Sequence, residues 1–223
     1  MTLDIFDILY QNLADSSILE AIAVIFGILS VWFAKKENIL VYPTGIISVL
    51  IYIYICFFVK LYADMGINFV YFVMSIYGWY MWSRKDAGKH VLPISWCKPK
   101  DHLISAAMLV GFFITLSYVL SNYIGSNVPI YTDSNIPIYI DRNIPIIDSL
   151  TTSFFIVGMW LMARKKIENW IYWIIGNVIS IPLYFYKELA LTSIQFTVFL
   201  VLAIMGFIEW RQKLKQKALS DQT

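Results

Sequence analysis

The chain has 223 residues, of which 59% are hydrophobic and 14% are charged, and its formal net charge is +2. Soluble globular domains carry about 25% charged residues, so this composition excludes an ordinary soluble domain and indicates a membrane protein. The basic residues form no Lys/Arg-rich face with interleaved aromatic side chains, so we expect no nucleic acid as a partner.

Seven apolar stretches follow one another along the chain. Each has about 17–22 residues, which at 1.5 Å per helical residue is enough to cross the ~30 Å hydrocarbon core of a bilayer. They cover residues 18–34, 39–58, 66–82, 103–124, 147–163, 170–186 and 189–210. We therefore predict an all-α polytopic membrane protein with seven transmembrane helices.

The basic residues predict the orientation of these helices in the membrane. Fourteen of the seventeen Lys and Arg residues lie on one side of the spans, and the other side carries only Lys60, Arg142 and Lys187. Because segments rich in Lys and Arg stay in the cytoplasm, we predict that the N-terminus lies outside and the C-terminus in the cytoplasm.

Similar residues recur in two groups of three spans. The second and sixth spans open with the same spacing at an offset of 131, in Asn38, Tyr42 and Gly45 and in Asn169, Trp173 and Gly176. The third and seventh spans close alike at an offset of 128, in Gly78 and Trp82 and in Gly206 and Trp210. Because one span separates the groups, both have the same orientation. This pattern predicts two parallel three-helix bundles joined by a linker helix, in a 3+1+3 arrangement.

The repeat divides the chain into six segments. They are an extracytoplasmic N-terminal segment (1–17), the first three-helix repeat (18–85), a cytoplasmic loop with the linker helix (86–124), an outer loop (125–146), the second three-helix repeat (147–210) and a basic cytoplasmic tail (211–223). The outer loop contains three Asn-x-Pro-Ile units with a period of eight. We interpret them as a tandem expansion without function, and a lid over an outer vestibule is the alternative.

The cysteines and histidines predict no metal centre and no cofactor. Cys56 lies within the second span, whereas Cys97, His90 and His102 belong to the cytoplasmic loop and its junction with the fourth span. No further ligand follows there at a spacing typical of metal sites, so we expect solvated histidines. The cytoplasm also disfavours disulfides.

The sixth span carries the strongest candidate binding face. Trp170, Trp173 and Asn177 lie at i, i+3 and i+7 on one helical face, which Ser180 and Tyr184 extend. Two indoles with an amide below them can enclose a flat ring, and their faces attract a cationic ring by ~0.5–2 kcal/mol. An interfacial tryptophan belt with an Asn contact between helices is the alternative explanation.

Two further spans carry amides at membrane depth. Asn68 and Tyr71 share a face of the third span, and Gln195 lies in the seventh. An amide both donates and accepts, so a pair facing one cavity can recognise a carboxamide or ribose hydroxyls. The glycines of these spans, Gly78 and Gly206, suit close helix packing.

The span interiors contain no Asp, Glu, Lys, Arg or His, and the chain has no P-loop. Carriers coupled to protons or sodium need an ionisable group or a cation site at depth. The chain contains no catalytic constellation, so we do not expect an enzyme. We therefore expect a passive carrier for a specific substrate.

Three segments resemble one family. The run Trp170-Ile-Tyr-Trp173-Ile-Ile-Gly-Asn177 is similar to the WxxWxxxN motif of the PnuC-type vitamin transporters. Two further segments resemble the third and the last helix of that family, namely residues 62–82 and the stretch from Gln195 to Trp210. The resemblance covers about residues 20–212.

The resemblance implies a SWEET-like fold and a homotrimer in the lipid bilayer of the bacterial inner membrane. It also implies uptake of nicotinamide riboside, a precursor in NAD biosynthesis, by facilitated diffusion, with trapping by a cytoplasmic vitamin kinase. By this resemblance Trp170, Trp173 and Asn177 contact the vitamin, and Asn68 and Gln195 complete the site.

One departure from the family pattern bears on the substrate. Riboside transporters often have glutamine where this chain has Asn68, so the amide reaches one methylene less far. Thiamine is therefore the first alternative, because it also presents a cationic aromatic ring, and riboflavin is another. A SWEET-like sugar carrier or a non-transporting scaffold is a more distant interpretation.

Overall fold

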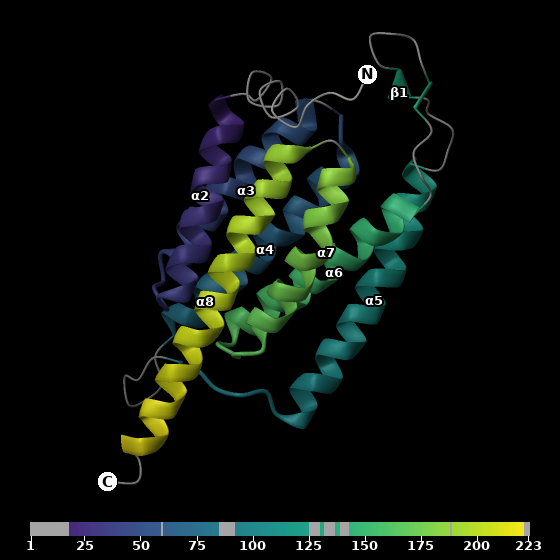
Figure 1. The fold of residues 1–223 in the computed structure, drawn as a ribbon. Coiled ribbons are helices and arrows are strands. Elements are labelled where there is room, and N and C mark those ends of the chain that lie inside the picture. The colour runs from purple at the N-terminus through teal and green to yellow at the C-terminus, as the bar shows by residue number, and fades with distance from the viewer. Residues whose placement is uncertain are drawn as a thin grey trace.

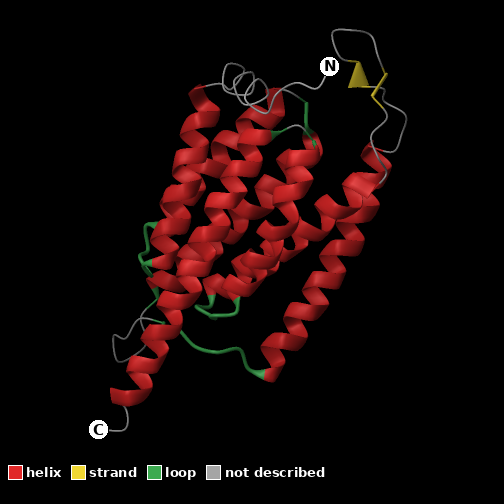
Figure 2. Ribbon diagram, viewed as in Figure 1, coloured by secondary structure: helices red, strands yellow, loops and turns green. Residues whose placement is uncertain are grey.

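The computed structural model describes residues 18–58, 60–84, 92–124, 130–131, 137–138, 143–187 and 189–220. These residues form seven helices: α2 (Ile18–Lys35), α3 (Val41–Phe58), α4 (Tyr62–Ser83), α5 (Pro99–Ile124), α6 (Asn143–Ala163), α7 (Asn169–Tyr186) and α8 (Ala190–Ser220) (Figure 1). Two short strands, β1 (Ile130–Tyr131) and β2 (Pro137–Ile138), pair antiparallel in the outer loop (Figure 2). The all-α class is thus confirmed. The predicted N-terminal segment, His90 and most of the outer loop lie outside the described residues.

Each predicted span corresponds to one helix, and the ends differ in ways that the local sequence explains. α8 continues to Ser220, ten residues past the predicted end, because the basic tail is rich in Lys, Gln and Leu, which favour helix. α5 begins at Pro99, before the apolar stretch, because proline suits the first helical position.

Five of the seven helices are long and apolar enough to cross a membrane: α2, α3, α5, α6 and α8. The other two, α4 and α7, have 22 and 18 residues, so their length suffices. Their composition is more polar, because α4 carries Asn68 and several tyrosines and α7 carries Asn177 and Ser180. Six of the seven predicted site residues therefore lie on these two more polar helices, and the seventh, Gln195, lies on α8.

The helices pack as two groups of three, which we call the first group (α2–α4) and the second group (α6–α8). Successive helices within each group are in contact. The third helix of each group packs on the first helix of the other, α4 on α6 and α8 on α2. α5 stands at the edge of the bundle in Figure 1 and packs chiefly on α6.

The two groups contain the same tight turn after their first helix. Asn38 donates its N–H to the Phe33 carbonyl, and Lys166 donates its N–H to the Leu161 carbonyl in the same way. The donors of the two bonds are 128 residues apart, and so are the acceptors. The same offset relates the two turn residues with positive φ, Glu37 (59°) and Lys165 (50°).

The offset of 128 corrects the predicted register of the second and sixth spans. The motif beginning at Asn38 and Asn169 predicts 131, whereas α3 begins at Val41 and α7 at Asn169. In this register Trp170 corresponds to Tyr42. The error is three residues, close to one helical turn, so the sequence motif still marks a similar face.

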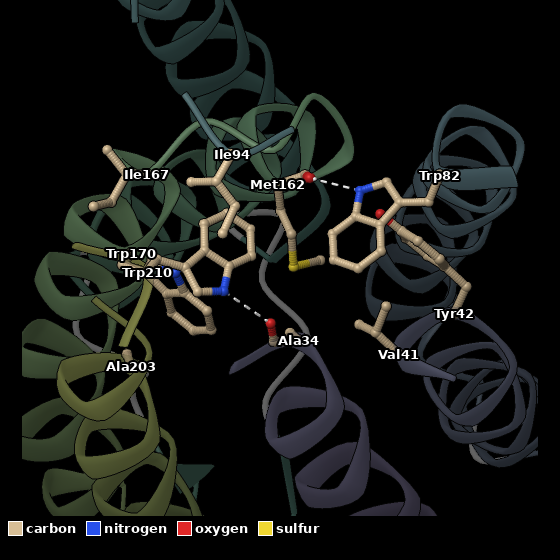
Figure 3. Close-up of a cluster of buried hydrophobic side chains, with 10 residues drawn as sticks. All are labelled: Ala34, Val41, Tyr42, Trp82, Ile94, Met162, Ile167, Trp170, Ala203 and Trp210. Carbon is tan, nitrogen blue, oxygen red and sulfur yellow. Dashed lines mark hydrogen bonds between the residues drawn. The ribbon is translucent and has the colours of Figure 1, made fainter. Parts of the chain in front are cut away.

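The core of the bundle lies at the end where tight turns join α2 to α3 and α6 to α7, and we call it the inner cluster. Its ten buried residues are Ala34, Val41, Tyr42, Trp82, Ile94, Met162, Ile167, Trp170, Ala203 and Trp210 (Figure 3). Tyr42 meets Trp82 edge to face, with ring centroids 5.3 Å apart, and Trp170 meets Trp210 in the same way at 5.5 Å. The cluster is therefore built from two copies of one aromatic pair.

Each copy also donates a hydrogen bond to the other group. The Trp82 indole donates to the Met162 carbonyl at 3.0 Å, and the Trp210 indole donates to the Ala34 carbonyl at 3.2 Å (Figure 3). Both acceptors lie at the end of the partner group's first helix. The exchange joins the two groups at this end.

Ion pairs surround the inner cluster and join the same two groups. Lys165 pairs with Glu37 at 2.7 Å, and Lys213 pairs with the other oxygen of that carboxylate at 3.2 Å. The Lys165 ammonium also lies over the Trp82 ring, 4.5 Å from its centroid. The turn residues related by the offset of 128 thus contact one another directly.

Candidate functional site

The predicted stripe on α7 is largely buried and poor in hydrogen-bond partners. Trp170 is 1% exposed, and Asn177 and Ser180 are each 0% exposed. Neither amide atom of Asn177 has a partner among the described residues, and neither does the Ser180 hydroxyl. Buried polar atoms are normally satisfied, because an unpaired one costs ~1–3 kcal/mol. A buried amide without partners is therefore a candidate ligand-binding group.

Trp170 belongs to the inner cluster. It packs edge to face on Trp210, and its indole covers Gly206, where no side chain would fit. This environment matches the packing explanation for Trp170. Seven residues along the helix, ~10 Å at 1.5 Å per residue, separate it from Asn177.

Trp173 occupies space that a glycine of α6 leaves open. A Cβ at Gly158 would lie 3.0 Å from the Trp173 indole nitrogen. At the equivalent positions of the first group, α2 carries Ser30 and α3 carries Gly45, so the glycine lies on the second helix instead of the first. A Cβ at Gly45 would lie 2.9 Å from the Ser30 hydroxyl. A large side chain therefore enters the helix contact from α7 in the second group only.

The next contact between the first two helices of each group is also exchanged, but here the glycine lies on α7 in the second group and on α2 in the first. In the second group the Phe155 ring covers Gly176, whereas in the first group Ser48 faces Gly27. Phe155 also contacts the Trp173 ring, with centroids 5.2 Å apart. The second group thus gains two aromatic rings where the first has small residues.

Aromatic rings form a continuous line from Trp173 through the second group. Phe155 stacks on Phe196 with ring centroids 5.9 Å apart and planes 10° apart, and Phe196 stacks on Tyr184 at 4.9 Å. We call Trp173, Phe155, Phe196 and Tyr184 the aromatic line. Such rings can stack on a flat heterocycle, and the Asn177 amide on the same helix can bond its substituents.

Gln195 and Tyr71 lie close to polar side chains of neighbouring helices. Gln195 of α8 lies within interaction range of Tyr52 of α3, in the other group, and Tyr71 of α4 lies within interaction range of Thr152 of α6. Tyr52, Tyr71 and Tyr184 lie close enough to interact electrostatically. The structure therefore brings the predicted residues Gln195, Tyr71 and Tyr184 into one region between the groups.

Asn68 is placed differently. Its amide donates to the Asp64 carbonyl of its own helix at 2.9 Å. Within the described part of the chain no hydrogen bond joins it to Asn177 or Gln195. The predicted place of Asn68 in the site stays a prediction.

The hollows at the surface lie elsewhere. One is lined mainly by apolar residues of α4 and α5, and a second lies between α6 and α7. Neither includes any of the seven predicted site residues. Because both hollows are lined mainly by apolar residues, we place the candidate site at the buried polar atoms instead.

Sequence reasoning missed several residues of this region, notably Phe155, Gly158, Phe196 and Tyr52. Aligning the two groups at an offset of 128 would have found Phe155 and Tyr52, because Phe155 matches Gly27 and Tyr52 matches Ser180. Gly158 matches Ser30, another small residue, so this alignment does not single it out.

Comparison with known proteins gives three findings. The family model described as "Nicotinamide mononucleotide transporter" matches residues 17–212. The nicotinamide riboside transporter PnuC of Escherichia coli is 28% identical over 218 residues, which cover 91% of this chain and 89% of that protein. The riboflavin/roseoflavin transporter RibM of Streptomyces davaonensis is 21% identical and covers 83% and 81% of the two chains.

The fold resembles a solved structure. The crystal structure of the vitamin B3 transporter PnuC matches with a TM-score of 0.61 and 22% identity, covering 95% of this chain and 90% of that one.

Proposed function

Because the chain belongs to the nicotinamide mononucleotide transporter family, we propose that this multi-pass membrane protein carries nicotinamide riboside into the cell by facilitated diffusion. The relative from Escherichia coli, named for that riboside, supports the substrate. The observation that carries the proposal is Asn177, a fully buried amide whose atoms have no partner in the described chain.

The chemistry of the site favours a nucleoside over a nucleotide. The buried polar groups without partners on α7 are indole, amide and hydroxyl groups. No Lys or Arg lies among them, and a buried phosphate needs such a partner. A cationic nicotinamide ring, by contrast, is attracted by aromatic faces such as those of Trp173 and Phe155.

Each predicted residue has a proposed role. Trp173 and Tyr184 supply ring faces, and Asn177 bonds the carboxamide or the ribose. Gln195 and Tyr71 add polar contacts from α8 and α4. Trp170 and Asn68 stay in the proposed set, Trp170 as the packed support of Trp173 and Asn68 as a group that joins the site in another conformation.

The arrangement we propose is two parallel three-helix repeats, α2–α4 and α6–α8, joined by α5. The reciprocal packing of α4 on α6 and α8 on α2 supports it. Rocking of one repeat against the other would alternate access to the site. The inner cluster then closes the cytoplasmic side and must separate when the carrier opens inward.

The basic residues support an N-terminus outside and a C-terminus in the cytoplasm. A homotrimer and coupling to a cytoplasmic vitamin kinase complete the proposal. A kinase would sustain uptake, because phosphorylation removes the free substrate from the inner side of a passive carrier.

Riboflavin is the second candidate substrate, and the relative named for riboflavin supports it. Thiamine is distinguished by the same experiment. The purified protein in detergent is titrated calorimetrically with nicotinamide riboside, thiamine and riboflavin. Tight binding of the riboside alone supports the proposal. Binding of another vitamin alone keeps the carrier and overturns the substrate, and silence with all three favours a sugar carrier or a scaffold.

A further inference from the structure

The segment before α5 is held on the turn between α6 and α7. Ser95 pairs with Lys166 in a parallel β-bridge, donating its N–H to the Lys165 carbonyl at 3.0 Å and accepting from the Ile167 N–H at 3.1 Å. The Lys166 ammonium donates to the Ser95 hydroxyl at 3.0 Å. This attachment brings residues 95–102 next to the start of α7.

The start of α5 places Cys97 beside His102. Asp101 accepts the Lys98 N–H at 2.9 Å and donates its own N–H to the Lys98 carbonyl at 2.8 Å. This reciprocal pair makes Lys98 the residue that caps the helix. Cys97 then precedes the cap and His102 is the fourth residue of the helix, and side chains at these two positions are neighbours.

Glu168 completes the group from the start of α7. It is 8% exposed, and both of its carboxylate oxygens accept the Cys97 N–H, at 2.9 and 3.0 Å. The nearby basic residues are engaged elsewhere, since Arg164 and Lys166 pair with Asp101 at 2.9 and 3.5 Å. In the part of the chain that the structure describes, no cation pairs with Glu168. A buried carboxylate without a cation is unfavourable, and a bound cation would offset the cost.

We propose that Cys97, His102 and Glu168 form a binding site for a divalent cation of the zinc type. Their ligand atoms all lie within 4.8 Å of one another. Thiolate, imidazole and carboxylate are ligands that Zn²⁺ accepts in proteins, whereas Mg²⁺ and Ca²⁺ select oxygen. His102 is exposed, so a water molecule can take the fourth position.

The site joins the start of α5 to the start of α7. Metal binding would therefore fix the linker helix to the second group at the cytoplasmic end. This role is independent of the vitamin site, because none of the three ligands belongs to the aromatic line or lies beside Asn177.

Cobalt titration of the purified, untagged full-length protein tests the proposal. Co²⁺ bound by a thiolate gives a charge-transfer absorption band, which we expect to saturate at one equivalent and to disappear when Zn²⁺ is added. The band should be lost in Cys97→Ser and unchanged in Cys56→Ser, the matched control within α3. His102→Ala should weaken cobalt binding about tenfold or more, as loss of a metal-site partner does.

A second readout uses stability. Zn²⁺ should raise the Tm of the wild type, because a ligand of the folded state stabilises it, and should leave the Tm of Glu168→Gln unchanged. The glutamine still accepts the Cys97 N–H, so this variant keeps the local structure. No band with excess Co²⁺, or a band that persists in Cys97→Ser, overturns the metal site. Binding of nicotinamide riboside to Cys97→Ser, measured in parallel, keeps the two proposals separable.

Discussion

The inner cluster takes residues from both helix groups and keeps their symmetry, whereas the aromatic line lies in the second group alone. In the inner cluster, Tyr42 and Trp82 repeat as Trp170 and Trp210, with edge-to-face contacts at 5.3 and 5.5 Å. Along the aromatic line, Trp173 and Phe155 occupy positions where the first group has Gly45 and Gly27. Symmetric contacts suit a joint between two moving halves, whereas an asymmetric substrate requires an asymmetric site.

This comparison predicts that changes in the two regions have different consequences. Substitutions along the aromatic line should change affinity for the substrate with little effect on stability. Substitutions in the inner cluster should change stability, and should do so by similar amounts in the two groups.

The largest effect is expected for Asn177→Leu. Loss of a hydrogen bond to the ligand costs ~1–3 kcal/mol, so affinity for nicotinamide riboside should fall about 10- to 100-fold. The Tm should not fall, because the buried amide has no partner to lose among the described residues. Calorimetric titration and thermal unfolding measure both quantities.

The matched control for Asn177→Leu is Asn122→Leu. The Asn122 side chain is exposed on α5 and donates to the Tyr118 carbonyl of its own helix. Affinity should stay unchanged in this variant. Wild-type affinity in Asn177→Leu would overturn the assignment of the site.

Gly158→Ala should lower affinity about tenfold, which corresponds to ~1.4 kcal/mol. The added methyl group would lie 3.0 Å from the Trp173 indole nitrogen, so the ring must move. Gly45→Ala is the matched control, because its methyl group meets the Ser30 hydroxyl at 2.9 Å in the first group. It should cost stability and leave affinity intact. Equal losses of affinity in the two variants would contradict the asymmetry.

Trp82→Phe and Trp210→Phe should each lower the free energy of unfolding by about 1–2 kcal/mol, because each leaves a carbonyl of the other group without its indole donor. The two losses should agree within about 0.5 kcal/mol, near the scatter of such measurements. Denaturant unfolding in detergent measures them. Trp79→Phe, which changes an indole that is 40% exposed, is the control and should cost little. A large loss of stability in only one of Trp82→Phe and Trp210→Phe would show that the two aromatic pairs are not equivalent.

The smallest effect is expected for Glu37→Gln. It removes the ion pairs with Lys165 and Lys213 at the rim of the inner cluster, and the Lys165 ammonium keeps its contact with the Trp82 ring, so we expect a loss of about 1 kcal/mol. The Tm should fall slightly at low salt and less at high salt, because ions screen the pair with Lys213, whose side chain is 38% exposed. The double variant Glu37→Lys, Lys165→Glu exchanges the two charges and should restore part of the loss. A salt-independent decrease would show that the carboxylate acts through packing.

Much of the fold follows from the sequence, because an apolar stretch that can span a bilayer is a local property of the chain. The seven helices were predictable for this reason. The beginning of α5 was not, since it depends on Pro99 and on the Lys98–Asp101 capping pair rather than on hydropathy.

The site was less predictable, because it depends on contacts between helices. The helical spacing of Trp173 and Asn177 identified a face of α7, but nothing in that spacing shows that Gly158 makes room for the indole. The same spacing grouped Trp170 with them, although it packs in the inner cluster. Glu168 and Cys97 lie 71 residues apart, so only the folded chain brings them together.

The ion pair between Glu37 and Lys165 bears on the origin of the two halves. Both residues occupy the same left-handed turn position, and they meet each other. In a homodimer of identical half-sized subunits, this position would bring glutamate against glutamate or lysine against lysine, and like charges in contact oppose association. The two halves are therefore complementary at this position, and a pair of identical halves would lose this ion pair.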